Sequence, residues 1–296
     1  MTKKELKTFL HKKSSYLKKG KNYLSDTFSV SIEDAKEALR EVILEKKGVN
    51  IKIKRLFFDI ETTPNVVYTW RAGYNITISH DSIIKERRII SIHYKWANSN
   101  KVHHLVWDEH QRDKKMLIEF IKIANQADEI VAHNGDRFDI KWLRTRCIYH
   151  RIPMFPEYKT LDTLKKAKKF FNFNSNKLDY ISQFLKVGAK TKHEGYSLWL
   201  KVMDDDKEAL KTMLIYGDND VIILEDVYKI MERYITPQTH HGVLQGKEVT
   251  SCPNCTSNDY KYIAAKVTPG GTIQRHMQCN NCKTSYKISN AKYLKL

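Results

Sequence analysis

The sequence has no long apolar run. No stretch of its 296 residues approaches the roughly 20 consecutive apolar residues that a membrane-spanning helix needs. Its first residues, Met1 to Glu5, run into further lysines and lack the apolar centre of a secretion signal. Both absences predict a protein with no membrane association that acts in the cytoplasm.

Acidic residues are in short supply. Asp and Glu number 34 against 52 Lys and Arg, which gives a formal net charge of +18 and a pI near 9.5. Such an imbalance is typical of proteins that bind a polyanion. A membrane surface would also attract this charge, but no basic helix with a large apolar face stands out. The composition therefore favours nucleic acid as the partner.

Cysteine is also scarce. Of five cysteines, Cys147 lies in an apolar-periodic segment and is expected in the core. The other four form two Cys-x-x-Cys pairs near the carboxyl terminus, Cys252 with Cys255 and Cys279 with Cys282. In a cytoplasmic protein this spacing indicates metal rather than disulfides. Four thiolates make a closed tetrahedral site, so we expect one structural Zn²⁺ in a zinc ribbon. A metal-free tail with accidental spacing is the alternative.

The pattern divides the chain into three regions, without internal repeats or low-complexity tracts. Residues 1–50 are lysine-rich and helical in period, and Ser31 with Asp34 forms a helix-start signal. This region is similar to a helix-turn-helix, with a small helical bundle as the other interpretation. Residues 51–236 form the main domain. Residues 237–296 begin with a linker and carry the cysteine pairs, which flank a hairpin tip at Pro269-Gly270-Gly271.

Strand-like and helix-like runs alternate in the main domain. Strands are expected at residues 53–60, 89–94, 102–107 and 129–133, with a turn at residues 98–100, and helices at residues 112–127 and 138–150. Strands followed by alternating strand and helix predict an α/β fold with a mixed sheet flanked by helices.

Two carboxylates end the first expected strand. Successive side chains of a strand point to opposite faces, so Asp59 and Glu61, two apart, lie side by side. Like charges this close repel each other unless a cation lies between them. The pair therefore indicates a divalent metal site.

Further acidic residues are expected at positions that could also bind the metal. Asp139 is expected at the start of a helix that leaves the sheet edge after the Asn134-Gly135 turn, where catalytic groups cluster in open α/β folds. Tyr216 and Asp220, four apart, share one helix face. Asp218 competes with Asp220 for the metal role but does not share that face. Asp162 is expected to be structural.

Three of these segments resemble known motifs. Phe58-Asp59-Ile60-Glu61-Thr62, Asn134 to Asp139, and Tyr216-x-x-x-Asp220 are similar, in order and spacing, to the motifs of DEDD-type 3′→5′ exonucleases of the ribonuclease H-like superfamily. Tyrosine in the third motif resembles the branch that includes family B DNA polymerase proofreading domains. No polymerase-like region is attached, so the chain looks like a stand-alone exonuclease of phage-type genomes, which would act in the host cytoplasm.

The resemblance implies a ribonuclease H-like fold and a catalytic site. Asp59, Glu61, Asp139 and Asp220 would hold two Mg²⁺ or Mn²⁺ ions, which prefer oxygen ligands. Tyr216 would orient the attacking water. Thr62, Asn134 and Phe138 match positions that line the strand terminus in the family.

The implied reaction is metal-dependent hydrolysis of phosphodiester bonds at DNA 3′ ends by a two-metal mechanism. Single-stranded DNA or frayed 3′ ends are the expected substrates, and a separate polymerase or other replication protein is a further expected partner. Tyr260, Tyr262 and Tyr286 interleave with basic residues near the carboxyl terminus, which suits base stacking. Two alternatives remain open, a 3′→5′ exoribonuclease and a non-catalytic nucleic-acid-binding adaptor.

Overall fold

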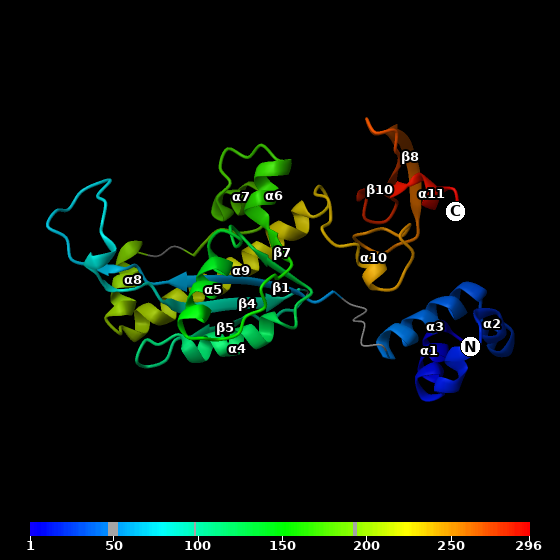
Figure 1. Ribbon diagram of the computed structural model, residues 1–296, viewed down its shortest axis with the longest axis horizontal. Coiled ribbons are helices and arrows are strands. Elements are labelled where there is room, and N and C mark those ends of the chain that lie inside the picture. Colours follow the sequence, from blue (N-terminus) through cyan, green and yellow to red (C-terminus); the bar gives the residue numbers. More distant parts are fainter. Residues whose placement is uncertain (47–52, 98, 192–193) are drawn as a thin grey trace. The chain divides into compact units, whose positions relative to one another are not determined.

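A five-stranded mixed sheet forms the centre of the main region (Figure 1). The computed structural model describes residues 1–46, 53–97, 99–191 and 194–296. They fall into two units, one of Lys54–Met231 and the other of Met1–Ile53 with Glu232–Leu296. The expected boundary near residue 50 and the turn position 98 lie outside the described residues.

The sheet has the order β5-β4-β1-β6-β7. Its strands are β1 (Arg55–Thr62), β4 (Ile89–Trp96), β5 (His103–Val106), β6 (Glu129–Ala132) and β7 (Thr160–Asp162). The β1–β4 and β4–β5 pairs are antiparallel, whereas the β1–β6 and β6–β7 pairs are parallel. The prediction of a mixed α/β sheet is confirmed, with strand ends shifted by up to two residues.

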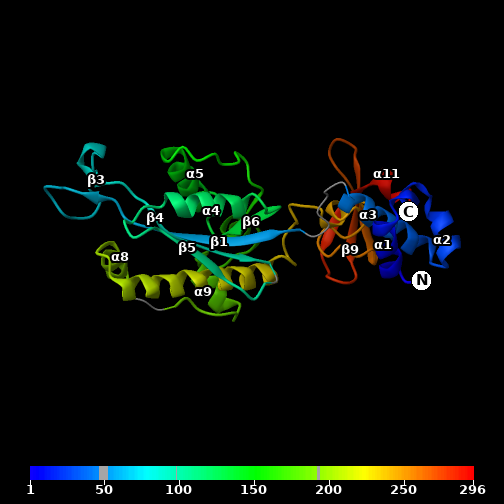
Figure 2. The same ribbon diagram turned by 90° about the horizontal axis from the view of Figure 1, so that it is seen from below.

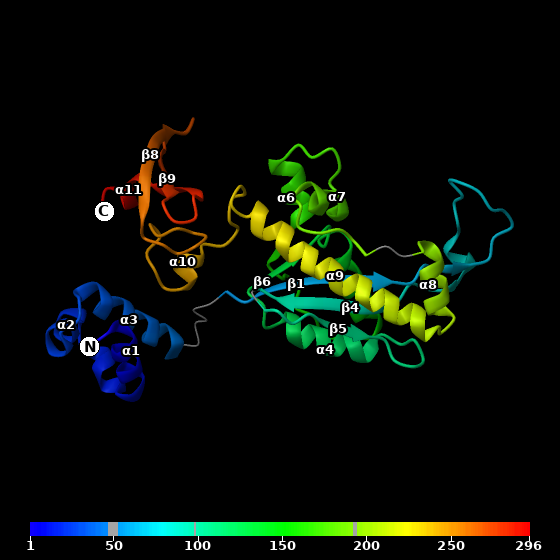
Figure 3. The ribbon, with the colours of Figure 1, turned by 180° about the vertical axis from the view of Figure 1, so that it is seen from behind.

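Helices cover both faces of this sheet. Helices α4 (Lys114–Ala124) and α5 (Asp139–Tyr149) lie on one face, and the long helix α9 (Lys207–Met231) crosses the other (Figures 2 and 3). Along β1, Phe58 packs against Phe120 of α4, whereas Phe57 contacts Tyr228 of α9 with ring centroids 5.7 Å apart. Because side chains alternate along a strand, Asp59 shares the α9 face with Phe57.

The remaining elements of this unit connect the layers. They are β2 (Val66–Val67), η2 (His80–Ser82), β3 (Ile83–Lys85), α6 (Thr163–Phe170), α7 (Leu178–Phe184) and α8 (Tyr196–Met203). The helix expected at residues 112–127 is shorter at both ends, because Asp113 occupies the cap position before α4 and Asn125 the cap position after it.

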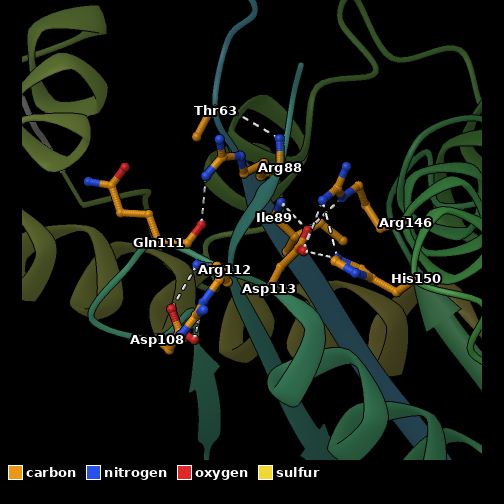
Figure 4. Close-up of polar contacts among 9 residues, drawn as sticks. All are labelled: Thr63, Arg88, Ile89, Asp108, Gln111, Arg112, Asp113, Arg146 and His150. Carbon is orange, nitrogen blue, oxygen red and sulfur yellow. Dashed lines mark hydrogen bonds and ion pairs between the residues drawn. The ribbon is translucent and has the colours of Figure 1, made fainter. Parts of the chain in front are cut away.

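A buried polar cluster joins α4, α5 and β4 (Figure 4). The Asp113 carboxylate accepts two hydrogen bonds from Arg146, at 2.7 and 3.0 Å, and one from the backbone N–H of Ile89 at 3.2 Å. His150 Nε2 lies 2.6 Å from the same carboxylate. All the lone-pair directions of this buried charge are thereby engaged, which a buried carboxylate needs.

A second set of contacts fixes the end of β1 (Figure 4). Thr63 N–H donates to the Arg88 carbonyl at 2.9 Å, and Arg88 N–H donates to Thr63 Oγ1 at 3.0 Å. The Arg88 guanidinium then donates to the Gln111 carbonyl at 3.1 Å. These bonds hold the chain directly after Glu61, where the β1–β4 register shifts.

The amino-terminal region is helical, as expected. It contains α1 (Lys3–Lys12), η1 (Ser14–Lys18), α2 (Lys21–Phe28) and α3 (Ile32–Lys46). Thr2 caps α1, and Ser31 Oγ accepts from Asp34 N–H at 3.0 Å at the start of α3. A small core of its own holds these helices together, formed by Leu6, Leu10, Leu24, Ala35, Ala38 and Val42.

The carboxyl-terminal region is a small three-stranded sheet. After α10 (His241–Leu244) come β8 (Tyr260–Val267), β9 (Ile273–Cys279), β10 (Ser285–Ser289) and α11 (Asn290–Tyr293), with strand order β10-β9-β8. The expected hairpin tip lies between β8 and β9, where Gly271 has φ 78°. The expectation that Tyr286 stacks on bases is wrong, because its side chain is buried and donates to the Thr250 carbonyl.

Among the described residues, no helix combines the length and the apolar character needed to cross a membrane.

Candidate active site

Strand β1 carries two of the expected carboxylates to one place. Asp59 and Glu61 lie on the face covered by α9, and Glu61 is buried. Cross-strand, Asp59 is paired with His93 of β4. The strand ends here because the register shifts after Glu61, so both carboxylates stand at the edge of the sheet.

Asp139 reaches the same edge from the start of α5. Its carboxylate accepts a hydrogen bond from Ile60 N–H at 3.1 Å, between the two carboxylate positions of β1. The turn before α5 depends on Asn134, with φ 68°, and on Gly135, where an added Cβ would lie 2.4 Å from Ala132 Cβ. The turn that the sequence suggested is therefore required by this close approach.

Asp162 fixes that turn and is structural, as expected. Its carboxylate accepts from the N–H groups of Asn134 and Asp136 at 3.0 and 3.3 Å. The same carboxylate caps α6 through the N–H groups of Leu164 and Lys165. These four bonds connect Asp162, the last residue of β7, to the turn after β6 and to the start of α6.

Helix α9 supplies Tyr216 and Asp220. Both are buried on one helix face, as their spacing predicted. Lys190 forms an ion pair with Asp220 and donates to the Tyr216 hydroxyl at 2.9 Å. Among the described residues, the second oxygen of Asp220, Oδ1, is buried with no hydrogen-bond partner. Asp218 turns elsewhere, toward His93 and His104.

A pocket of about 700 Å³ opens over these groups. Its lining includes Asp59, Glu61, Asn134, Tyr216 and Asp220 of the predicted set. Asp139 is buried and, among the described residues, is not part of the lining. Thr62 follows Glu61 at the strand end, and Phe138 packs against the core below α5. These two, among the described residues, also do not line the pocket.

Burial, with the charges of neighbouring carboxylates, shifts the pKa values of this group upward. Burial, together with the charge of Asp220, raises the pKa of Asp59 to about 7. Burial and the charge of Asp59 raise the pKa values of Glu61 and Asp139 well above the ordinary range. Burial also raises the pKa of Asp220, although Lys190 opposes the shift. The folded chain therefore holds these four groups in a place that disfavours their ionisation unless cations are present.

This donor set fits hard divalent cations. Carboxylate oxygens are the ligands that Mg²⁺ and Mn²⁺ prefer. The unpartnered Oδ1 of Asp220 is an unused donor that points to such a role. Among the described residues, these carboxylates do not form a group of three or more whose ligand atoms all lie within 4.8 Å of one another, whereas the four carboxyl-terminal cysteines do.

The four carboxyl-terminal cysteines lie together. Cys252 and Cys282 Sγ are 3.5 Å apart, and Cys255 and Cys279 Sγ are also 3.5 Å apart. These distances exceed the roughly 2.0 Å of a disulfide and approach the roughly 3.8 Å between thiolates on one tetrahedral Zn²⁺. The four thiols therefore fit a zinc ion.

Sequence reasoning missed several residues of the pocket, Lys190 above all. Lys190 lies in the loop after α7. Asp179 of α7 accepts from Lys190 N–H at 3.0 Å, and Asn219 of α9 donates to the Ala189 carbonyl. Both helices therefore hold this part of the loop in place. Other missed lining residues are His133, Leu164, Lys168, Asn176, Lys177, Leu178 and Asp179. In a chain with 52 Lys and Arg residues, no spacing or motif distinguishes Lys190.

A mixed sheet flanked by helices, with acidic side chains gathered at one edge, is the arrangement of ribonuclease H-like domains. Residues 56–232 match the sequence model of the RNase_H superfamily, and the chain belongs to this family.

Among solved structures, the chain is similar to the family B DNA polymerase from the hyperthermophilic archaeon Pyrobaculum calidifontis, with a TM-score of 0.49 and 13% sequence identity. The similarity covers 74% of this chain and 31% of that polymerase, so the chain spans about a third of its length. None of the curated proteins compared with this chain matches it.

Proposed function

We propose that the chain is a metal-dependent 3′→5′ exonuclease of the tyrosine DEDD type, which hydrolyses phosphodiester bonds at DNA 3′ ends. The observation that carries the proposal is the convergence of Asp59, Glu61 and Asp220, from β1 and α9, on one pocket beside Tyr216. Asp139 of α5 lies next to them outside the lining, hydrogen-bonded to Ile60 N–H. Membership of the RNase_H superfamily supports a nuclease.

The four carboxylates would hold two Mg²⁺ or Mn²⁺ ions. Burial and mutual repulsion raise their pKa values, which supports binding of positive charge, and four carboxylates suit a pair of ions about 4 Å apart. When bound, such a pair supplies an activated water and stabilises charge on the departing 3′ oxygen.

Tyr216 would orient the attacking water. Burial and the charge of Asp220 raise the pKa of its hydroxyl to about 12, so it stays protonated at neutral pH and acts as a hydrogen-bonding group rather than a base. Lys190 and Asp220 fix the position of the hydroxyl.

Basic side chains at the pocket would bind the DNA strand. Lys168 and Lys177 line it and suit the phosphates, and Asn134 lines it at the turn after β6. By resemblance, Thr62 and Phe138, which lie outside the lining of the pocket, would also contact the 3′-terminal nucleotide. The substrate is single-stranded DNA or a frayed end, and the net charge of +18 supports a polyanion. A separate polymerase is a candidate partner.

The flanking regions would assist binding. We assign catalysis to residues 51–236, a basic helical region to residues 1–50, and a linker with a zinc ribbon to residues 237–296. One Zn²⁺ on Cys252, Cys255, Cys279 and Cys282 is supported by their 3.5 Å sulfur spacings. Its role is structural, because four protein ligands leave no open position.

Replacing Asp59 tests the reaction. Asp59→Ala should abolish release of nucleotides from 5′-labelled single-stranded DNA in Mg²⁺, with binding retained in a fluorescence anisotropy titration. Glu119→Ala is the matched control, because Glu119 is an exposed acid of α4 on the opposite face of the sheet. Unchanged turnover in Asp59→Ala would refute the assignment.

The same assay distinguishes the polarity and the nucleic acid. If strands that keep their 5′ label shorten stepwise, the attack comes from the 3′ end. A parallel digestion of labelled RNA compares the rates for ribose and deoxyribose strands. Faster loss of RNA than of DNA would replace the proposed substrate by RNA.

A further inference from the structure

Three metal-ligating side chains lie together outside the carboxylate site. His93 of β4 and His104 of β5 are paired across the two strands, on the face covered by α9. Asp218 of α9 contacts both: its carboxylate lies 2.8 Å from His93 Nδ1 and 2.9 Å from His104 Nδ1. We call these residues the His93–His104–Asp218 cluster.

Asp218 and Asp220 serve different sites. Residues two apart on a helix point about 200° apart around its axis, because each residue turns it by about 100°. Asp220 faces the pocket with Tyr216, whereas Asp218 faces β4 and β5. The helix comes close to the sheet here, since a Cβ at Gly217 would lie 2.3 Å from His93 Nε2.

From this geometry we propose that the His93–His104–Asp218 cluster binds a divalent transition metal ion, with zinc as the best fit. One nitrogen of each imidazole and one carboxylate oxygen lie within 4.8 Å of one another. Nitrogen and oxygen ligands stand about 2.0–2.1 Å from zinc, so tetrahedral ligands lie about 3.3 Å apart. The nitrogen–oxygen distances of 2.8 and 2.9 Å need to lengthen by only roughly half an ångström.

The surroundings of His93 suit a ligand. His93 is fully buried, and its Nε2 lies 2.9 Å from Ser91 Oγ. Metal-bound histidines commonly donate their other N–H to an oxygen, which fixes the ring. In the tautomer with hydrogen on Nε2, Ser91 accepts that hydrogen and the Nδ1 lone pair faces the carboxylate of Asp218. Two electron-pair donors facing each other need a cation between them.

Three protein ligands leave one position for water. The side chains of His104 and Asp218 are 39% and 27% exposed, so solvent reaches that position. The ion would tie β4, β5 and α9 together two residues before Asp220. We assign it a positioning role, because none of the three cluster residues lines the pocket over the carboxylates.

A metal-free cluster is the alternative, in which both imidazoles donate Nδ1–H to the Asp218 carboxylate.

The metal content of the protein distinguishes a bound ion from this metal-free cluster. The full chain is dialysed to equilibrium against buffered Zn²⁺ with excess Mg²⁺ to fill the carboxylate site, and zinc per chain is measured by mass spectrometry of the elements.

His104→Ala should retain one zinc equivalent fewer than the wild-type chain. The matched control is His103→Ala, because His103 is the preceding residue of β5 but stacks on Tyr94 on the opposite face, and it should keep the wild-type content. Equal zinc contents in wild type and His104→Ala would overturn the proposal.

A second readout covers the case in which His104→Ala alters folding. Co²⁺ bound to nitrogen and oxygen ligands absorbs in the visible range without the sulfur-to-metal charge-transfer bands that thiolates give. Asp218→Asn should bind one Co²⁺ equivalent fewer than the wild-type chain while the thiolate charge-transfer bands keep their intensity, and Cys279→Ser should weaken those bands. An unchanged Co²⁺ content in Asp218→Asn would also contradict the cluster as a metal site.

Discussion

At the scale of residues, the pocket combines four carboxylates that repel one another with one phenol held by its neighbours. Burial raises the pKa of each of the four carboxylates, so their ionised forms are disfavoured in the metal-free protein. Tyr216 differs from them, since it remains neutral and is fixed by Lys190 and Asp220. Charge and orientation are thus supplied by different side chains.

Removing the Tyr216 hydroxyl tests this division. Tyr216→Phe should lower kcat by roughly 100-fold with little change in KM, because the variant loses the orientation of the water but keeps the carboxylates. Steady-state digestion of labelled DNA at varied DNA concentrations measures kcat and KM. Tyr149→Phe, at an exposed tyrosine of α5, is the control. Wild-type kcat in Tyr216→Phe would exclude a role for the hydroxyl.

At the scale of elements, buried polar contacts keep the helices in place on the sheet. Asp113 connects the start of α4 to Arg146 of α5, to His150 directly after α5, and to the first residue of β4 (Figure 4). Burial alone raises the pKa of Asp113, but the hydrogen bonds from Arg146 and His150 outweigh it, and the net pKa is lowered.

Asp113→Asn should destabilise the fold. Removing one partner of a buried ion pair costs about 3–5 kcal/mol, because Arg146 then keeps an uncompensated charge. A lowered folded-state pKa means that the stabilisation is present above the unfolded value of about 3.9 and is lost as pH falls through the lower folded-state pKa. The free energy of unfolding of the wild type, measured in urea, should therefore decrease in that acid range. The free energy of unfolding of Asp113→Asn should depend less on pH there.

Glu208→Gln provides the comparison for this measurement. Glu208 forms an exposed pair with Lys211 at 3.9 Å, so its loss should change stability by less than about 1 kcal/mol. Equal unfolding free energies in Asp113→Asn and Glu208→Gln would show that the buried cluster does not stabilise the packing of α4 and α5.

At the scale of the whole molecule, positive charge is the dominant feature. The excess of Lys and Arg gives a net charge of +18. Binding of single-stranded DNA should therefore weaken as salt rises. If about four phosphates are neutralised, the affinity should fall roughly 50-fold between about 50 and 200 mM salt. Anisotropy titrations on catalytically inactive protein measure the slope, and an affinity independent of salt would contradict electrostatic binding.

Much of the fold could be predicted from local patterns. The strand at β1, the β4–β5 pair and the helices α4 and α5 follow from the spacing of apolar residues, and their ends moved by up to three residues where caps intervene. Cys147 is buried, as expected. Tyr286 is buried too, although it was expected to be exposed for stacking on bases. The latter error arose because alternation along β10 puts Tyr286 on the covered face, which composition alone does not reveal.

The candidate site was predictable in part. The helical spacing separated Asp220 from Asp218, and the strand spacing joined Asp59 to Glu61, because both depend on residues close in sequence. Lys190 could not be foreseen: it reaches Asp220 from a loop whose position depends on Asp179 and Asn219.

The sequence by itself determined which elements form, the order of the acidic motifs and the pairing of cysteines, since each is written in side chains a few positions apart. Only the tertiary structure decided that His93, His104 and Asp218 meet, that Lys190 enters the pocket, and that Asp220 keeps a buried oxygen without a partner among the described residues. These contacts join residues far apart in the chain, and such long-range contacts depend on how the strands pair and on where α9 packs across the sheet.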